Sequence, residues 1–524
     1  MIFCRESCIL SGMMRRSIEK LLQHAWLQLA ISILLMLYLV LEMESIIPIS
    51  DASYCFMDAV LWSDALNAFH AGNINLAAKM DRPPLSLVFG SVLKHFGYST
   101  PQALQLIAKL SFAGSVGFLF GGIWRFHSLP IACLSAYLLL YAPSYTKLSL
   151  WLNAQMFCNC IFVMHLVFGW ILIKKRKPWS WLLLGLLASA GTLAKEQGLL
   201  LYPLTLLFCL GYSGTITQSL RQGFYFVIGS LPLGIWQFTW LRAQNNYGEK
   251  WRLFDEDLRL LFSRESWQDF LRIKTSWGSF AHRFYDEQDI TQFFYKTADI
   301  LLRELLPLST LALYFSGALF LIGLIGRKIG DNGQFFWYLF HFLAIVPLLL
   351  IPIFEPYHYT AIAIGSVALL SWGLHTLWTI HPALSLMAIY WGFQAYPLWG
   401  KHPETTLRSE ARGCIETRIL PVREWARTNL ERGASLYFTD TMVPWAKGYY
   451  PQTVKVLTAS TALEEMSCTS DYVVMSELSN NRDYFKQYFD DEKGPHAPSW
   501  PRIGEINAVN KEVWWIYQKP CSEE

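Results

Sequence analysis

The chain has 524 residues, of which 53% are hydrophobic and only 16% are charged. Soluble proteins carry roughly 25% charged residues, so this composition excludes an ordinary soluble protein. The net charge of +3 is spread along the chain and excludes a nucleic-acid partner, which would require positive residues gathered on one face. Apolar runs of about 20 residues, the length needed to cross a bilayer, recur over 25–400 and predict an integral membrane protein.

The first span is expected at 25–43, after a basic N-terminal segment of residues 1–24. It is longer than the core of a signal peptide, and no small-residue cleavage pattern follows it, so we expect a retained anchor. Basic residues ahead of a first span place the N-terminus in the cytoplasm.

Hydropathy predicts about eleven spans over 25–400, each crossing a hydrocarbon core of about 30 Å. They are expected at 25–43, 102–124, 129–147, 152–173, 179–194, 197–212, 222–243, 301–326, 333–353, 358–378 and 380–399. Lys195-Glu196-Gln197-Gly198 interrupts the short pair 179–194 and 197–212, which leaves open that one of the two is a re-entrant half-helix.

The short loops support this topology. Those predicted to be cytoplasmic carry Arg125, the run from Lys174 to Lys177, Arg221 and Arg327-Lys328. The short loops between them are poor in Lys and Arg, as the positive-inside bias requires. An odd number of spans then places residues 401–524 outside.

Three segments lack a crossing run, and all three are expected on the external side: 44–101, 244–300 and 401–524. In the first, Pro84 to Gly97 is expected to form a helix with proline in its first turn, lying in the membrane interface. The second is charged and contains tryptophan, which favours the headgroup level, so a lid lying on the membrane and a disordered linker both stay open.

The last segment alternates between helix-like and strand-like runs, which predicts a small α/β domain. The helix-like runs are 422–430 and 482–489, and the strand-like runs are 434–439, 453–458, 471–476, 503–509 and 512–517. No Gly-rich phosphate loop is present, so a soluble cap without catalytic residues is preferred. Its three cysteines, Cys414, Cys468 and Cys521, are an odd number, and no specific disulfide is predicted.

Charged residues near a membrane are costly unless they are paired or used, so polar clusters at the external ends of spans are candidate sites. There are four: Asp51/Asp58/Asp64, Asp81-Arg82, Lys195-Glu196 and Glu355-Pro356-Tyr357-His358-Tyr359. Carboxylates supply a general base, and cations can neutralise a leaving phosphate. Taken singly, a cluster of this kind more often marks the solvated end of a span than a functional site. Together at one face they indicate transfer of a group from a phosphate-linked lipid.

The order Asp58-x-x-x-Trp62, Ala71-Gly72-Asn73 and Asp81-Arg82-Pro83-Pro84-Leu85 resembles the first external loop of GT-C glycosyltransferases. The branch it resembles contains the bacterial aminoarabinose-to-lipid A transferases and the protein O-mannosyltransferase-like enzymes. The segment 185–203, with Thr192-Leu193-Ala194-Lys195, is similar to a helix pair of that family. The resemblance implies a GT-C fold with interfacial helices in the first external loop.

The resemblance also implies an inverting transfer of a sugar from a polyprenyl-phosphate donor, undecaprenyl or dolichyl, to a lipid, glycan or protein acceptor. Asp58 matches the catalytic acid of the loop, which activates or orients the acceptor. Arg82 and Lys195 match cations that contact the donor phosphate, and Asp81 matches the acid beside the first of them. His358, between Tyr357 and Tyr359, matches a phosphate-contacting cluster by position only.

The sequence departs from the family pattern at three places. Asn153 stands where a second acid is common at the start of the fourth span, Ala59 follows the loop acid, and Glu196 replaces a glycine and offsets Lys195. A neutral amide is a poor ligand for a hard divalent cation, so a two-acid metal site is disfavoured and no metal ligands are predicted.

Several alternatives stay open. Asp51 could replace Asp58 as the loop acid, although the spacing to Gly72 favours Asp58. Pro83-Pro84 could simply interrupt regular secondary structure at the membrane interface, without a role in the site. Three histidines fall within spans and are expected to pack or hydrogen-bond with neighbours instead of binding a ligand: His165, His341 and His375.

Two other functions compete with sugar transfer. A lipid or solute transporter usually shows internal repeats and broken helices near midspan, and no convincing repeat is visible. A ligase or polymerase of polyprenyl-linked glycans would use a late external loop rich in Arg and His, and 244–300 carries Arg252, Arg264, Arg272, His282 and Arg283. The absence of an Asn-x-Ser/Thr pattern favours a bacterial inner membrane with a site facing the periplasm.

Overall fold

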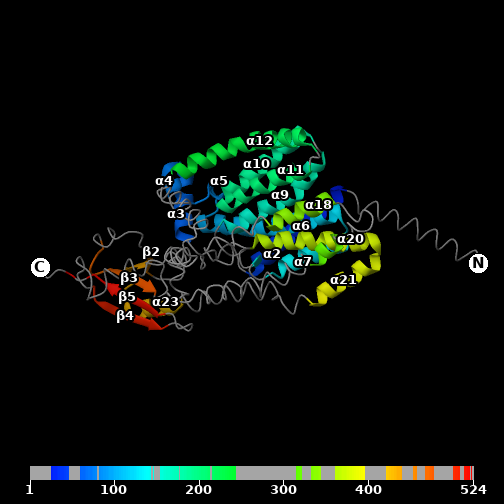
Figure 1. The fold of residues 1–524 in the computed structure, drawn as a ribbon. Coiled ribbons are helices and arrows are strands. Elements are labelled where there is room, and N and C mark those ends of the chain that lie inside the picture. The colour runs from blue at the N-terminus through cyan, green and yellow to red at the C-terminus, as the bar shows by residue number, and fades with distance from the viewer. Residues whose placement is uncertain are drawn as a thin grey trace, which may run out of the picture.

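The computed structural model describes residues 25–46, 59–79, 82–142, 145–146, 154–175, 177–212, 215–243, 314–320, 332–343, 360–395, 420–438, 452–456, 466–476, 500–507, 513–519 and 521. These residues form a bundle of helices followed by a five-stranded sheet (Figure 1). The loop 244–300 and residues 351–359 lie outside them.

The bundle contains the apolar helices expected from the sequence. They are α2 (Ala25–Ile46), α6 (Thr100–Phe126), α7 (Leu129–Leu140), α9 (Gln155–Lys175), α10 (Pro178–Ala194), α11 (Leu201–Tyr212), α12 (Ile216–Arg242), α18 (Asn332–Leu343), α20 (Ala361–Ile380) and α21 (Pro382–Ala395). Five of these described helices, α2, α6, α9, α12 and α20, are long and apolar enough to cross a membrane. The helical, membrane-spanning character of the chain is therefore confirmed, while the number of spans stays a prediction.

Several helix ends differ from the expected ones by a few residues, and the largest differences among the described helix ends are at α12 and α7. α12 begins at Ile216 and takes in Arg221, which was expected in a loop, because the Thr215 side chain caps the helix by accepting the backbone N–H of Gln218 at 3.3 Å. α7 ends at Leu140, short of the expected 147. Pro143 follows in the sequence, and a residue before proline is disfavoured in a helix.

α10 and α12 approach each other with their backbones in contact. A Cβ atom added to Gly185 would overlap the carbonyl oxygen of Phe226, and one added to Gly229 would overlap that of Leu182. The Ser189 hydroxyl also donates to the Ser230 carbonyl at 3.0 Å. Small residues allow such close packing where lipid provides no hydrophobic drive between helices.

Buried polar side chains inside the bundle are paired with one another. The His165 and His341 rings are joined by an Nδ1 to Nε2 hydrogen bond of 2.9 Å, and the Thr205 hydroxyl lies 3.1 Å from the other His165 nitrogen. Both histidines are buried, and the prediction that they bond with neighbours is confirmed. They join α9, α11 and α18.

Three short helices, α3 (Ala59–His70), α4 (Ile74–Lys79) and α5 (Pro84–His95), lie at one end of the bundle beside the C-terminal end of α12 (Figure 1). We call this end the Arg82 end. Gly72 has a φ of +82° and lets the chain turn out of α3, while the Asn73 N–H bonds back to the Ala68 carbonyl at 2.9 Å. The Asn73 side chain then accepts the backbone N–H of Leu76 at 3.3 Å and so begins α4.

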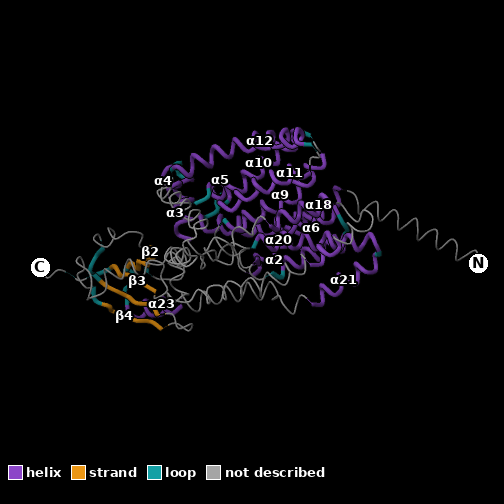
Figure 2. Tube along the Cα trace, viewed as in Figure 1, coloured by secondary structure: helices purple, strands orange, loops and turns teal. Residues whose placement is uncertain are grey.

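The chain ends in a sheet of order β2-β1-β3-β5-β4, whose strands lie together apart from the bundle (Figure 2). The strands are β1 (Ser435–Phe438), β2 (Thr453–Val456), β3 (Asp471–Ser476), β4 (Arg502–Asn507) and β5 (Val513–Gln518). The first three are parallel, and β5 pairs antiparallel with β3 and β4. Each coincides with an expected strand-like run. The limits of the domain and its external location stay predictions.

α23 (Leu420–Asn429) covers this sheet by packing Val422 and Ala426 against Leu436 and Trp514. The sequence left open which two of the three cysteines could join, and the structure gives the pair. Cys468 and Cys521 are joined, with their Cα atoms 5.1 Å apart. The pairing depends on β3 and β5 being neighbours, which the sequence spacing does not reveal.

Candidate functional site

Arg82 lies immediately before α5, with Pro83 in the capping position and Pro84 in the first turn. Its guanidinium carbon is 5.7 Å from the centre of the Trp62 ring on α3. Trp62 is buried, whereas Arg82 is half-buried. A guanidinium over an indole face is held without losing its charge. The expected motif therefore brings its aromatic residue and its cation into contact.

The backbone of Arg82 is held by a second indole. Trp240, near the C-terminal end of α12, donates its Nε1–H to the Arg82 carbonyl at 3.0 Å and is itself buried. Its ring also lies 6.1 Å from that of Phe69 on α3. Trp240 has no site signal in the sequence, because a tryptophan at the end of a span is typical of an anchor at the membrane interface.

A shared apolar cluster supports these contacts. Trp62 and Trp240 pack with Leu87 of α5, with Leu104 of α6 and with Ala154 at the start of α9. Phe89 of α5 and Phe157 of α9 also meet edge to face at 5.3 Å. Arg82 therefore stands over the point where the ends of α3, α5, α6, α9 and α12 converge.

A polar brace fixes α3 against α5 and α6. The Lys94 ammonium donates to the Asn67 side-chain oxygen at 2.5 Å and to the Thr100 hydroxyl at 2.8 Å, and Thr100 donates to the same oxygen at 2.7 Å. Burial lowers the pKa of Lys94 below its ordinary value. Lys94 bonds to neutral side chains of α3 and α6 and forms no ion pair with them. We therefore assign it a role in holding the short helices together.

Lys195 lies between α10 and a short 3₁₀ helix, η2 (Glu196–Leu200), that leads into α11. It is extended, with φ −166° and ψ 153°, and half-buried. Its N–H donates to the Gly191 carbonyl at 3.0 Å, and its carbonyl accepts the Gly198 N–H at 2.9 Å. Gly198 packs directly on the Gly191 backbone, where a Cβ atom would overlap.

Lys195 lies at the Arg82 end of the bundle. α9, α10, α11 and α12 follow one another through short connections and so run in alternating directions. α9 begins beside α5, so the C-terminal ends of α10 and α12 both return to α5, and α10 also contacts α5. Arg82 and Lys195 thus come from separate elements at the same end.

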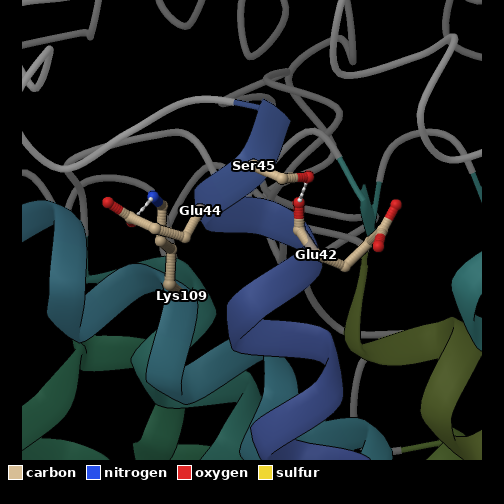
Figure 3. A network of polar contacts seen from close by, with 4 residues as sticks. All are labelled: Glu42, Glu44, Ser45 and Lys109. Atoms are coloured by element: carbon tan, nitrogen blue, oxygen red, sulfur yellow. Dashed lines mark hydrogen bonds and ion pairs between the residues drawn. The ribbon is translucent and has the colours of Figure 1, made fainter.

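A further charged pair at this end was also missed. Lys109, on α6, is fully buried and its ammonium lies 2.6 Å from the Glu44 carboxylate, whose side chain is 37% exposed. Figure 3 shows the two side chains meeting where the last turn of α2 passes α6, with Glu42 pointing away. The signal available in the sequence was a lysine inside an apolar run, which is costly without a partner.

The remaining predicted site residues are not tested by the structure. Asp58, Asp81, Asn153, Tyr357, His358 and Tyr359 lie outside the described residues, and so does the side chain of Glu196. Asp64 is exposed on α3, as expected for a solvated helix face. Within the described ranges, no three His, Cys, Asp or Glu side chains are placed to hold a metal ion.

No protein-family model and no curated protein sequence matches the chain. Solved structures do match it. The apo structure of ArnT from Cupriavidus metallidurans aligns with a TM-score of 0.53 at 12% identity, covering 94% of this chain and 97% of that one. The ArnT structure bound to undecaprenyl phosphate aligns with a TM-score of 0.51 at 13% identity over the same shares.

The apo oligosaccharyltransferase of Archaeoglobus fulgidus aligns with a TM-score of 0.50 at 12% identity, covering 86% of this chain and 69% of that one. At these identities the similarity is one of fold. The chain has the fold of GT-C glycosyltransferases, as its loop motif predicted.

Proposed function

We propose that the protein is a membrane glycosyltransferase that moves a sugar from a polyprenyl-phosphate donor to a lipid, glycan or protein acceptor. The observation that carries the proposal is the fixed cation at the Arg82 end, held over Trp62 and tied to α12 by Trp240. A pre-positioned guanidinium suits a phosphate group. The fold is shared with ArnT, a structure of which contains undecaprenyl phosphate.

In the proposed reaction, an acceptor oxygen attacks the anomeric carbon of the sugar as the bond from that carbon to the phosphate oxygen breaks. The configuration inverts, and the polyprenyl phosphate leaves with one more negative charge. Arg82 and Lys195 neutralise that charge, together with His358 and its neighbours Tyr357 and Tyr359. The proton of a hydroxyl acceptor passes to Asp58.

The supporting roles follow the loop motif. Asp81 orients Arg82, Glu196 offsets the charge of Lys195, and Asn153 stands where related sequences carry a second acid. We propose that the reaction needs no two-acid metal site, because an amide is a poor ligand for a hard divalent cation.

Two observations support an external site in a bacterial inner membrane. Arg125, Lys174, Lys175 and Arg221 occupy the helix ends opposite the Arg82 end, as the positive-inside bias expects for the cytoplasmic side. The disulfide between Cys468 and Cys521 suits an oxidising compartment such as the periplasm.

The acceptor class decides how much Asp58 matters. A hydroxyl must lose its proton, so Asp58→Asn would lower the rate by about 10²- to 10⁴-fold. An acceptor phosphate is already ionised, and the same variant would retain activity. The variant therefore separates the two acceptor classes once the donor is known.

The decisive test offers the purified protein a panel of radiolabelled polyprenyl-phosphate sugars. Wild type should turn over one donor class, and Arg82→Ala should lose most of that turnover. Arg221→Ala is the matched control, since Arg221 also lies over an aromatic ring, 5.8 Å from the centre of Tyr225, but at the opposite end of α12. Equal turnover by all three proteins, or turnover of no donor, contradicts the proposal.

A further inference from the structure

Arg82 is held at both ends by indoles that come from different helices. Its guanidinium rests on the Trp62 face, and its carbonyl accepts the Trp240 N–H. Trp62 belongs to the same loop motif as Arg82, whereas Trp240 is separated from Arg82 by 158 residues. The two contacts fix different parts of one residue.

Arg82 precedes α5, so its carbonyl is not expected to accept one of the hydrogen bonds within that helix. α5 begins at Pro84 and Pro83 is its cap, so the repeating bonds of the helix start after Arg82. Both prolines fix their φ angles, which makes the chain between Arg82 and α5 stiff. Pinning this carbonyl therefore pins the Cα position from which the guanidinium extends.

We infer that Trp240 is a positioning residue for the phosphate-binding side chain of Arg82. It acts through the backbone of Arg82, and Trp62 completes the arrangement by holding the charged end. The inference rests on the proposed function, because it assumes that Arg82 meets the donor phosphate. A cation fixed before the ligand arrives loses less conformational entropy on binding.

The test measures how strongly the site prefers a polyprenyl phosphate over the alcohol with the same chain. Affinities of each purified variant for decaprenyl phosphate and for decaprenol are determined in the same detergent, and their ratio removes the contribution of the tail. Trp240→Phe keeps an aromatic ring but lacks the N–H, so the ratio should fall by about 3- to 10-fold. A variant carrying benzothienylalanine at position 240 retains the indole shape and should show the same fall if Trp240→Phe does not fold.

The matched control is Trp337→Phe. Trp337 is buried and donates its Nε1–H to the Leu166 carbonyl at 2.8 Å, so the same kind of bond is lost deep in the bundle. This variant should melt at a lower temperature while its phosphate preference stays at the wild-type value. A purely structural role for Trp240 would give both variants the same behaviour.

A double-mutant cycle with Arg82→Ala completes the test. If Trp240 acts through Arg82, adding Trp240→Phe to Arg82→Ala should cause no further fall in the ratio. A normal ratio in Trp240→Phe, or an additional fall in the double variant, overturns this inference and leaves the proposed function standing. A normal ratio in Arg82→Ala overturns both.

Discussion

The ion pair between Glu44 and Lys109 predicts an asymmetric response to mutation. Lys109 is fully buried, whereas the Glu44 side chain is 37% exposed and can reach water. Glu44→Gln removes the negative charge and leaves a buried ammonium on α6. Removing one partner of a buried pair costs about 3–5 kcal/mol, because the pair no longer contributes to offsetting the desolvation of the remaining charge.

The opposite change should cost much less. Lys109→Met places an apolar side chain of similar length in the same buried position, and the remaining carboxylate turns to solvent at the end of α2. We expect a loss of about 1 kcal/mol or less, because the buried charge is replaced by an apolar side chain and the carboxylate that remains can be solvated. The double variant should resemble Lys109→Met, since it contains no buried charge at this position.

Unfolding of purified protein in mixed detergent and SDS micelles measures these differences. Ser45→Ala is the control, because Ser45 is exposed on the same turn of α2 and donates to the Glu42 carbonyl of its own helix at 2.7 Å (Figure 3). Its stability should stay within about 0.5 kcal/mol of wild type. A loss in Lys109→Met equal to or larger than that in Glu44→Gln would refute the reasoning.

Two further predictions follow from close contacts. Gly198→Ala places a Cβ atom against the Gly191 backbone, so α10 and η2 should separate, and both the melting temperature and the rate of sugar transfer should fall. The control is Gly211→Ala, because a Cβ atom added there would have no atom within 4 Å. This control should leave the rate unchanged and the melting temperature unchanged or slightly higher. Cys468→Ser should abolish the mobility shift on reduction in gel electrophoresis and lower stability by about 2–4 kcal/mol, whereas Cys133→Ser should change neither, since Cys133 is a free thiol. A mobility shift that persists in Cys468→Ser would contradict the assigned pair, and a stable, active Gly198→Ala would contradict the tight crossing.

The helices were predictable because their signals are local. An apolar run of sufficient length, proline in the first turn of α5 and glycine after α3 each depend on residues close in sequence. Helix ends were less accurate. The polar first turns of α12 look like a loop to hydropathy, yet they form a capped helix.

The site was only partly predictable. The contact between Trp62 and Arg82 lies within one motif, and the sequence singled out both residues. Trp240 and Arg82, which are hydrogen-bonded, are 158 residues apart in the sequence. Glu44 and Lys109, which form the ion pair, are 65 residues apart. Such contacts depend on which helices become neighbours, and a single sequence contains no record of that.

The start of α9 offers a physical account of the missing second acid. Gln155 donates its amide to the Asn159 oxygen at 3.1 Å, and the Asn159 amide donates to the Thr360 hydroxyl at 2.8 Å. All three side chains are buried, and the network joins α9 to the residue directly before α20. Neutral groups that hydrogen-bond to one another can be buried here at lower cost than a charge, whereas a carboxylate at this depth would need a cation or a metal ion beside it.

This network holds Thr360, and with it the start of α20, against α9. Ala154, one residue after Asn153, packs in the cluster beneath Arg82. The neutral start of α9 is therefore anchored on both sides, to α20 through Thr360 and to the Arg82 end through Ala154. In this chain an uncharged brace therefore joins two elements of the proposed site at the start of α9, where the loop-motif resemblance led us to expect a second acid.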